Sequence, residues 1–101
     1  MWESATPATR SAFARIVIHY VRHNAWLEDE ILLRGASALA AIPGILVNGR
    51  FDFQAPLANA WELQRVWPGA ELVVVHDAGH VPDANLSREL VRTTDRFATL
   101  P

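Results

Sequence analysis

The fold is decided by two short stretches, ILVNGRFD at positions 45–52 and VVVHDAGH at positions 73–80. Each stretch begins with an apolar run, residues 45–47 in the first and 73–75 in the second, and ends a few residues later at an ionisable residue, Asp52 or His80. Continuously apolar runs predict strands of a parallel sheet, because helices cover both faces of such strands. We therefore expect a carboxylate and an imidazole on loops that follow two strands of one sheet.

From residue 42 onward, the pattern predicts the order strand, helix, strand, helix. A helix is expected over residues 56–66, where apolar residues recur at helical spacing and Trp67-Pro68-Gly69 ends the pattern. Another helix is expected near the end of the chain, with Asp83 or Asn85 as its N-cap. A βαβ connection brings the ends of both strands to one edge of the sheet. The predicted fold class is therefore α/β, with Asp52 and His80 within reach of each other.

The first 41 residues are expected to form helices rather than strands. Apolar residues at three- and four-residue spacing predict a helix over residues 11–24: Phe13, Ile16, Val17, Tyr20 and Val21. Residues 28–39 are also expected to be helical, with a break at Gly35, because the three acidic residues at 28–30 would favour the positive end of the helix dipole. The chain is thus predicted to divide into a helical region, 1–41, and an α/β region, 42–101.

Asp52 and His80 are the candidate catalytic residues. A carboxylate that orients an imidazole, and an imidazole that takes a proton from a nucleophile, are two members of a nucleophile–His–acid triad. The sequence offers no nucleophile in the expected setting, because it has no cysteine and none of its serines lies in a Gly-x-Ser-x-Gly turn: Ser4, Ser11, Ser37 and Ser87. The order Asp before His fits enzymes whose nucleophile comes first, so the sequence is expected to be the last part of such an enzyme.

Two other histidines, His19 and His23, are four residues apart on the first predicted helix and could share one face of a metal site. No third ligand is evident, so no metal site is predicted. The tryptophans are expected to pack helices rather than to line a substrate cage: Trp2, Trp26, Trp61 and Trp67.

Composition argues against several classes of partner. The 101 residues carry a net charge of −2 and have a pI near 6.0, which gives no electrostatic reason to expect nucleic acid or an anionic membrane as partner. The absence of cysteine excludes disulfides and thiolate metal sites, and it fits a reducing compartment. Because the sequence has no signal-peptide pattern and no apolar run of ~18 residues, a cytoplasmic location is expected.

Four stretches of the sequence follow the pattern of a known family: A-R-I-x-x-H-Y at 14–20, I-P-G-I-x-V-x-G-R-x-D at 42–52, N-A-W-x-L at 59–63 with W-P-G-A-E-L at 67–72, and A-G-H at 78–80 with T-D-R-F at 94–97. By these stretches the chain resembles the C-terminal portion of proline iminopeptidases (prolyl aminopeptidases), serine peptidases of the α/β-hydrolase superfamily. G-R-x-D and A-G-H are common across the superfamily, whereas the tryptophan-containing stretches and T-D-R-F are more specific to these peptidases.

The resemblance implies the C-terminal βαβα part of an α/β-hydrolase parallel sheet, preceded in residues 1–41 by the end of a helical cap. It implies Asp52 and His80 as triad acid and base, a peptide substrate that loses its N-terminal proline, and neither metal nor organic cofactor. Val17 departs from the family, whose cap carries at this position a glutamate expected to bind the α-amino group of the substrate. Because valine cannot pair with an ammonium group, an esterase or amidase with a small ester or amide substrate is the alternative within enzymes.

A non-catalytic module is the alternative outside enzymes. Two parallel strands with apolar faces leave edges that a partner must cover, so such a module would self-associate through an exposed sheet edge. If the chain is instead part of an enzyme, we expect it to be inactive alone, because its nucleophile lies elsewhere.

Overall fold

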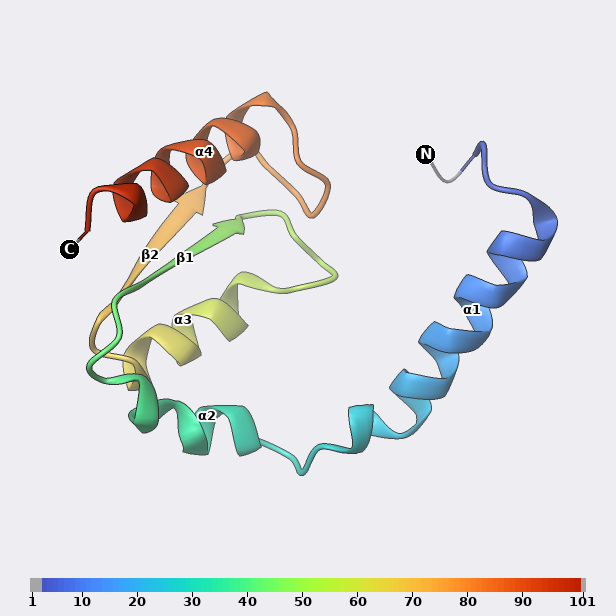
Figure 1. Ribbon diagram of the computed structural model, residues 1–101, viewed down its shortest axis with the longest axis horizontal. Coiled ribbons are helices and arrows are strands. Elements are labelled where there is room, and N and C mark those ends of the chain that lie inside the picture. The colour runs from blue at the N-terminus through green and yellow to red at the C-terminus, as the bar shows by residue number, and fades with distance from the viewer. Residues whose placement is uncertain (1–2, 101) are drawn as a thin grey trace. The chain divides into compact units, whose positions relative to one another are not determined.

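The computed structural model describes residues 3–100, and the contacts within the chain define two units that part between Ile31 and Leu32. The first unit contains α1 (Pro7–Arg22) and one turn of 3-10 helix, η1 (Asn24–Trp26) (Figure 1). The Thr6 hydroxyl caps α1 by accepting a hydrogen bond from the Thr9 amide (3.1 Å), and Pro7 fits the first helical position. α1 therefore begins before the predicted start at residue 11.

The second predicted helix is shorter than expected. Residues 28–30 form the turn before it, and Glu30 adopts a left-handed backbone conformation (φ 61°) that a helix cannot contain. α2 (Ile31–Gly35) is therefore only five residues long, and a 3-10 helix, η2 (Ala36–Leu39), follows it. The predicted start at residue 28 was wrong, because the acidic residues lie before the helix, whereas the predicted break at Gly35 is where α2 ends.

A two-stranded parallel sheet organises the second unit. β1 (Gly44–Gly49) pairs with β2 (Ala70–Val75) in a register that places Gly44 opposite Ala70 and Gly49 opposite Val75. α3 (Leu57–Val66) connects the two strands, and α4 (Ala84–Ala98) follows β2. Figure 1 shows α3 and α4 on opposite faces of the sheet. The predicted order of strand, helix, strand and helix is confirmed, and the fold is of mixed helix and parallel strand.

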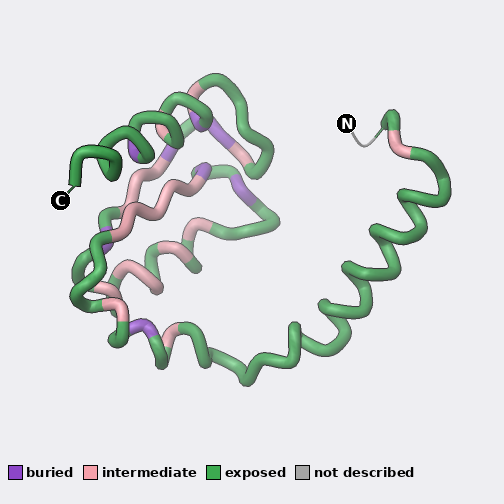
Figure 2. The backbone as a smooth tube through the Cα atoms, viewed as in Figure 1, coloured by how far each residue is buried: buried purple, intermediate pink, exposed green. Residues whose placement is uncertain are grey.

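One cluster of buried apolar residues lies near the carboxyl ends of the strands. Val75, Ala78 and Leu86 form a small apolar core against which Val47 packs. Figure 2 shows that these buried segments lie where the strands lead into the following loops. α4 begins above this core, where the Asp83 carboxylate accepts a hydrogen bond from the Leu86 amide (2.8 Å). The core thus supports the loops that follow the strands.

Two polar contacts hold the opposite end of the sheet. The Arg96 guanidinium donates to both carboxylate oxygens of Glu71 (2.7 and 3.1 Å), which joins the end of α4 to the start of β2. The Trp67 indole nitrogen donates to the carbonyl of Ile42 (2.9 Å), just before β1. These contacts fix the amino ends of both strands relative to the helices.

The division between the units lies nearer the N-terminus than the predicted boundary at residue 41. Residues 32–41 belong to the second unit, where Ala36 is buried and η2 contacts α3. The assignment of residues 1–41 to a cap stays a prediction. Among residues 3–100, no helix combines the length and the apolar character needed to cross a bilayer.

Candidate active site

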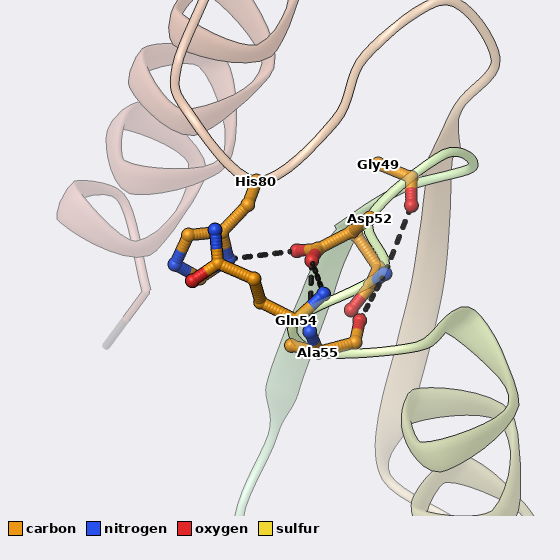
Figure 3. A network of polar contacts seen from close by, with 6 residues as sticks. Gly49, Asp52, Gln54, Ala55 and His80 are labelled. Carbon is orange, nitrogen blue, oxygen red and sulfur yellow. Dashed lines mark hydrogen bonds and ion pairs between the residues drawn. The ribbon is translucent and has the colours of Figure 1, made fainter.

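Asp52 and His80 occupy the loops that follow the two parallel strands. Asp52 lies three residues after β1, and its amide donates to the carbonyl of Gly49 (3.2 Å), which closes a tight turn. His80 lies in the loop between β2 and α4. Because the strands are parallel, both loops leave the same edge of the sheet, and the two side chains point toward each other (Figure 3).

The two side chains are in direct contact. His80 Nδ1 lies 3.0 Å from Asp52 Oδ2. The other carboxylate oxygen, Oδ1, accepts hydrogen bonds from the backbone amides of Gln54 (3.0 Å) and Ala55 (2.8 Å) (Figure 3). Asp52 is only 8% exposed, whereas the His80 side chain is 51% exposed. The carboxylate is therefore fixed by three donors, and the imidazole remains open to a reactant.

These donors also determine the charge of Asp52. The hydrogen bond from Ala55, followed by those from His80 and Gln54, lowers the pKa of Asp52 below its ordinary value, although partial desolvation opposes the shift. Asp52 is thus a carboxylate at neutral pH, and a carboxylate can only accept. His80 must then donate from Nδ1, which leaves the lone pair of the neutral imidazole on Nε2. The pair can accept a proton at Nε2 and stabilise the resulting imidazolium.

Gly49 allows the two loops to approach this closely. A Cβ at this position would lie 2.4 Å from the carbonyl oxygen of Gly79 and 2.6 Å from that of Ala78. The amide of Phe51 donates to the same carbonyl of Ala78 (3.0 Å) and joins the two loops directly. The backbone of the Asp52 loop is therefore packed against the backbone of the His80 loop, without a side chain between them.

The ends of the His80 loop are also joined to each other. Asn85, in the first turn of α4, donates its side-chain amide to the Asp77 carboxylate just after β2. Within the loop, Ala78 is 1% exposed and donates its amide to the carbonyl of Val75 (3.3 Å). These contacts set the path of the backbone on both sides of His80.

Some of these groups were not identified from the sequence. Of the two predicted N-caps, Asp83 is the one that caps α4, whereas the Asn85 side chain donates to Asp77. The amides of Gln54 and Ala55 were missed, although an Asp two or three residues before a potential donor is a known signal for a turn of this kind. The pairing of Asn85 with Asp77 has no local sequence signal, because it depends on the loop between them.

No serine of the chain lies on a turn between a strand and a helix. Ser11, Ser37 and Ser87 lie within α1, η2 and α4, and Ser4 lies in the turn before α1. Among residues 3–100, no three His, Asp or Glu side chains are grouped as a metal ion would require. The structure thus brings both predicted site residues together, and their catalytic role stays a prediction.

No family model matches the chain. A proline iminopeptidase of Xanthomonas citri is 43% identical over 89 residues, which cover 86% of this chain and 28% of the relative. A probable proline iminopeptidase of Leptolyngbya boryana is 42% identical over 88 residues, covering 85% of this chain and 27% of the relative. A proline iminopeptidase of Arabidopsis thaliana is 38% identical over 91 residues, which cover 88% of this chain and 24% of the relative.

The matched relatives are therefore much longer than this chain, which spans 27% to 31% of the length of the first three. Their identity extends over most of this chain, with 79% to 86% of it covered in the same three matches. Over the segment that these matches cover, the chain belongs to the proline iminopeptidase family.

Proposed function

We propose that this chain supplies the acid and the base of a catalytic triad in a hydrolase of the proline iminopeptidase type. The observation that carries the proposal is the contact of 3.0 Å between His80 Nδ1 and a carboxylate of Asp52 that is held by backbone amides. That arrangement is the one a general base needs, because it fixes the tautomer and the orientation of the imidazole. The names of the matched relatives supply the class of reaction.

In this mechanism, His80 moves the protons and Asp52 keeps its charge. Nε2 takes the proton of a serine hydroxyl as the serine oxygen forms a bond to the carbonyl carbon of the substrate. The imidazolium, stabilised by Asp52, then gives this proton to the leaving amine as the C–N bond breaks. In the second half, His80 takes a proton from water as the water oxygen attacks the acyl-enzyme, and it returns the proton to the serine oxygen. Neither Asp52 nor His80 attacks the substrate.

The serine and the oxyanion hole belong to another segment in this proposal. The second unit, with its two parallel strands between α3 and α4, corresponds to the C-terminal part of an α/β-hydrolase core, and the preceding helices correspond to the end of a cap. A triad without its nucleophile retains little catalysis, so this chain alone is expected to show no turnover.

The proposed substrate is a peptide with an N-terminal proline. One observation favours a second candidate, because Val17 lies where the family cap carries a glutamate for the α-amino group, and valine offers that group no charge. Its side chain is 41% exposed on α1. A hydrolase of small esters or amides without a free amino group would use the same Asp52 and His80. The two substrate classes differ only in how the substrate is recognised.

A hybrid enzyme tests the proposal. In this hybrid, the chain replaces its matching segment in the Xanthomonas citri relative. Turnover of prolyl amides by the hybrid, and its loss in the variants His80→Ala and Asp52→Asn, is the expected result. Asp52→Asn should lower kcat by about 10⁴-fold, because the amide can stabilise the wrong tautomer of His80. A folded hybrid whose kcat survives both substitutions would contradict the assignment.

Substrate choice is read from the same hybrid. Comparison of a prolyl amide with its N-acetylated form tests whether a free amino group is required. The substitution Val17→Glu should raise kcat/KM for the free amine and leave the acetylated substrate unchanged if this position contacts the substrate. Preference for acetylated or ester substrates, with no effect of Val17→Glu, would support the second candidate.

A further inference from the structure

The first unit contains a cluster of aromatic side chains that the proposed function does not use. His19 lies in the last turn of α1 and His23 caps the helix, so the two side chains lie on one face. Their ring centroids are 5.0 Å apart and their planes meet at 72°. Both residues are exposed. They are therefore close together, accessible, and separate in the sequence from Asp52 and His80.

The separation of the rings fits joint coordination of one metal ion. A Zn–N bond of about 2.0–2.1 Å places each imidazole centroid roughly 3.2 Å from the metal. Two such rings on one ion, at angles between square-planar and tetrahedral values, have centroids about 4.5–5.2 Å apart. The observed 5.0 Å lies within this range. The separation of the two rings is therefore compatible with one ion bound between them.

Trp26 holds both rings in place. Its indole is stacked on His23 (centroids 5.0 Å apart, planes at 11°) and meets His19 at an edge (5.3 Å, 61°). Both contacts are made by faces and edges of the rings, so the rings are restrained before any ligand binds. A restrained pair loses less conformational entropy when it binds an ion.

The backbone that brings Trp26 back onto α1 is unusual. Asn24, Ala25 and Trp26 have φ angles of 50°, 50° and 57°, in the left-handed region that non-glycine residues rarely occupy. The Asn24 side chain stabilises this turn by donating to the carbonyl of Leu27 (2.9 Å) and to the Asp29 carboxylate (3.3 Å). Such conformations occur preferentially at functional sites, where the surrounding structure maintains them.

The charges around His19 and His23 include groups that favour a bound cation and groups that oppose it. The site is at the carboxyl end of α1, where the helix dipole and free carbonyls favour positive charge. Asp29 adds a carboxylate to the same turn, whereas Arg22 and Arg15 on α1 oppose a cation. Neutral imidazoles suit Cu²⁺, Ni²⁺ and Zn²⁺ and are poor ligands for Mg²⁺ or Ca²⁺.

We propose that His19 and His23 form a solvent-open site for a divalent transition-metal ion, with Trp26 as the positioning residue. Two ring nitrogens bind the ion, and water completes its coordination, because the described residues offer no third His, Asp or Glu in one group with them. Chelation by residues four apart also fixes the last turn of α1, so binding stabilises the helix.

The test uses the full chain and the metal alone. Titration of the untagged chain with ZnCl₂ by calorimetry should show one equivalent bound with a dissociation constant in the micromolar range. His19→Ala and His23→Ala should each weaken binding by at least about tenfold, because the second ligand of a chelate acts at high effective concentration. His76→Ala is the matched control, since His76 is also exposed but lies just after β2, and this change should leave binding unaltered.

Circular dichroism and fluorescence test the same metal site independently of calorimetry. Zn²⁺ should raise the helical circular dichroism of the unsubstituted chain and of His76→Ala, and it should leave that of His19→Ala unchanged. Cu²⁺ should quench the fluorescence of Trp26, measured as the difference between the unsubstituted chain and Trp26→Phe. Zinc binding that persists in the double variant His19→Ala/His23→Ala, or no binding tighter than millimolar in the unsubstituted chain, would overturn the proposal.

Discussion

Substitution of Gly49 by alanine should separate the two loops that carry Asp52 and His80. The new Cβ would lie 2.4 Å from the carbonyl oxygen of Gly79. Carbon and carbonyl oxygen rarely approach within about 3.3 Å, so the backbones must move apart by about 0.9 Å. Backbone atoms form both sides of this contact, and no flexible side chain can move away instead.

The consequence for the site follows from the length of the hydrogen bond. Moving His80 Nδ1 from 3.0 Å to roughly 3.9 Å from Asp52 Oδ2 exceeds the range of a hydrogen bond. A displacement of this size in a catalytic group reduces rate by about 10²-fold, and complete loss of the acid reduces it by about 10⁴-fold. In the hybrid enzyme, Gly49→Ala should therefore lower kcat by about 10²- to 10⁴-fold and destabilise the protein by about 1–3 kcal/mol.

Two other glycines provide matched controls. Gly35→Ala meets no atom within 4 Å and should leave kcat and stability nearly unchanged. Gly44→Ala places a Cβ 2.3 Å from the Trp67 ring, at the other end of β1, and should lower the melting temperature with little effect on kcat. The reasoning is refuted if folded Gly49→Ala keeps a kcat within about twofold of the parent, or if Gly44→Ala loses as much kcat as Gly49→Ala.

Three further predictions concern the second unit and its surface. Asp83→Ala should cost about 0.5–2 kcal/mol in urea unfolding, because the Leu86 amide loses its cap acceptor, and an unchanged midpoint would contradict the role of this cap. Arg96→Met should destabilise the protein at neutral pH but not in strong acid. Arg96 lowers the pKa of Glu71, so its contribution is present above the unfolded pKa of Glu71 and is lost as the pH falls through the folded value; an equal loss at both pH values would exclude this origin. If the sheet edges are covered by a second copy, size-exclusion chromatography should give a concentration-dependent dimer, and a monomer at all concentrations would argue against the self-associating module.

The second unit was more predictable than the first, for a physical reason. Its strands are marked by short apolar runs, and α3 is marked by apolar residues at helical spacing and by the breaker Trp67-Pro68-Gly69. These signals are local, so the sequence shows them clearly. The turn at residues 24–30 contains four non-glycine residues with positive φ, which no propensity rule anticipates. Backbone hydrogen bonds hold this turn, and the Asn24 side chain adds bonds to two acceptors farther along the chain.

The candidate site was likewise predictable only in part. The residue types of Asp52 and His80, and their positions after two neighbouring strands, were sufficient to predict that they meet. The features that set their separation were not visible, because they are contacts between backbones: the approach at Gly49 and the hydrogen bond from Phe51 to Ala78. The sequence therefore predicts which groups meet, and the structure adds the contacts that hold them in position.

Among the described residues, the contacts that shape the Asp52–His80 pair come from the second unit. The carboxylate is held by amides of its own loop, and the His80 loop is closed by Asp77 and Asn85. No contact of this pair requires a nucleophile, so the pair should form before a nucleophile-bearing segment is added. In a hydrolase assembled from such parts, the free energy of orienting the base would be supplied by folding of this unit rather than by binding of substrate. Loss of the loop contacts should then lower kcat far more than it raises KM.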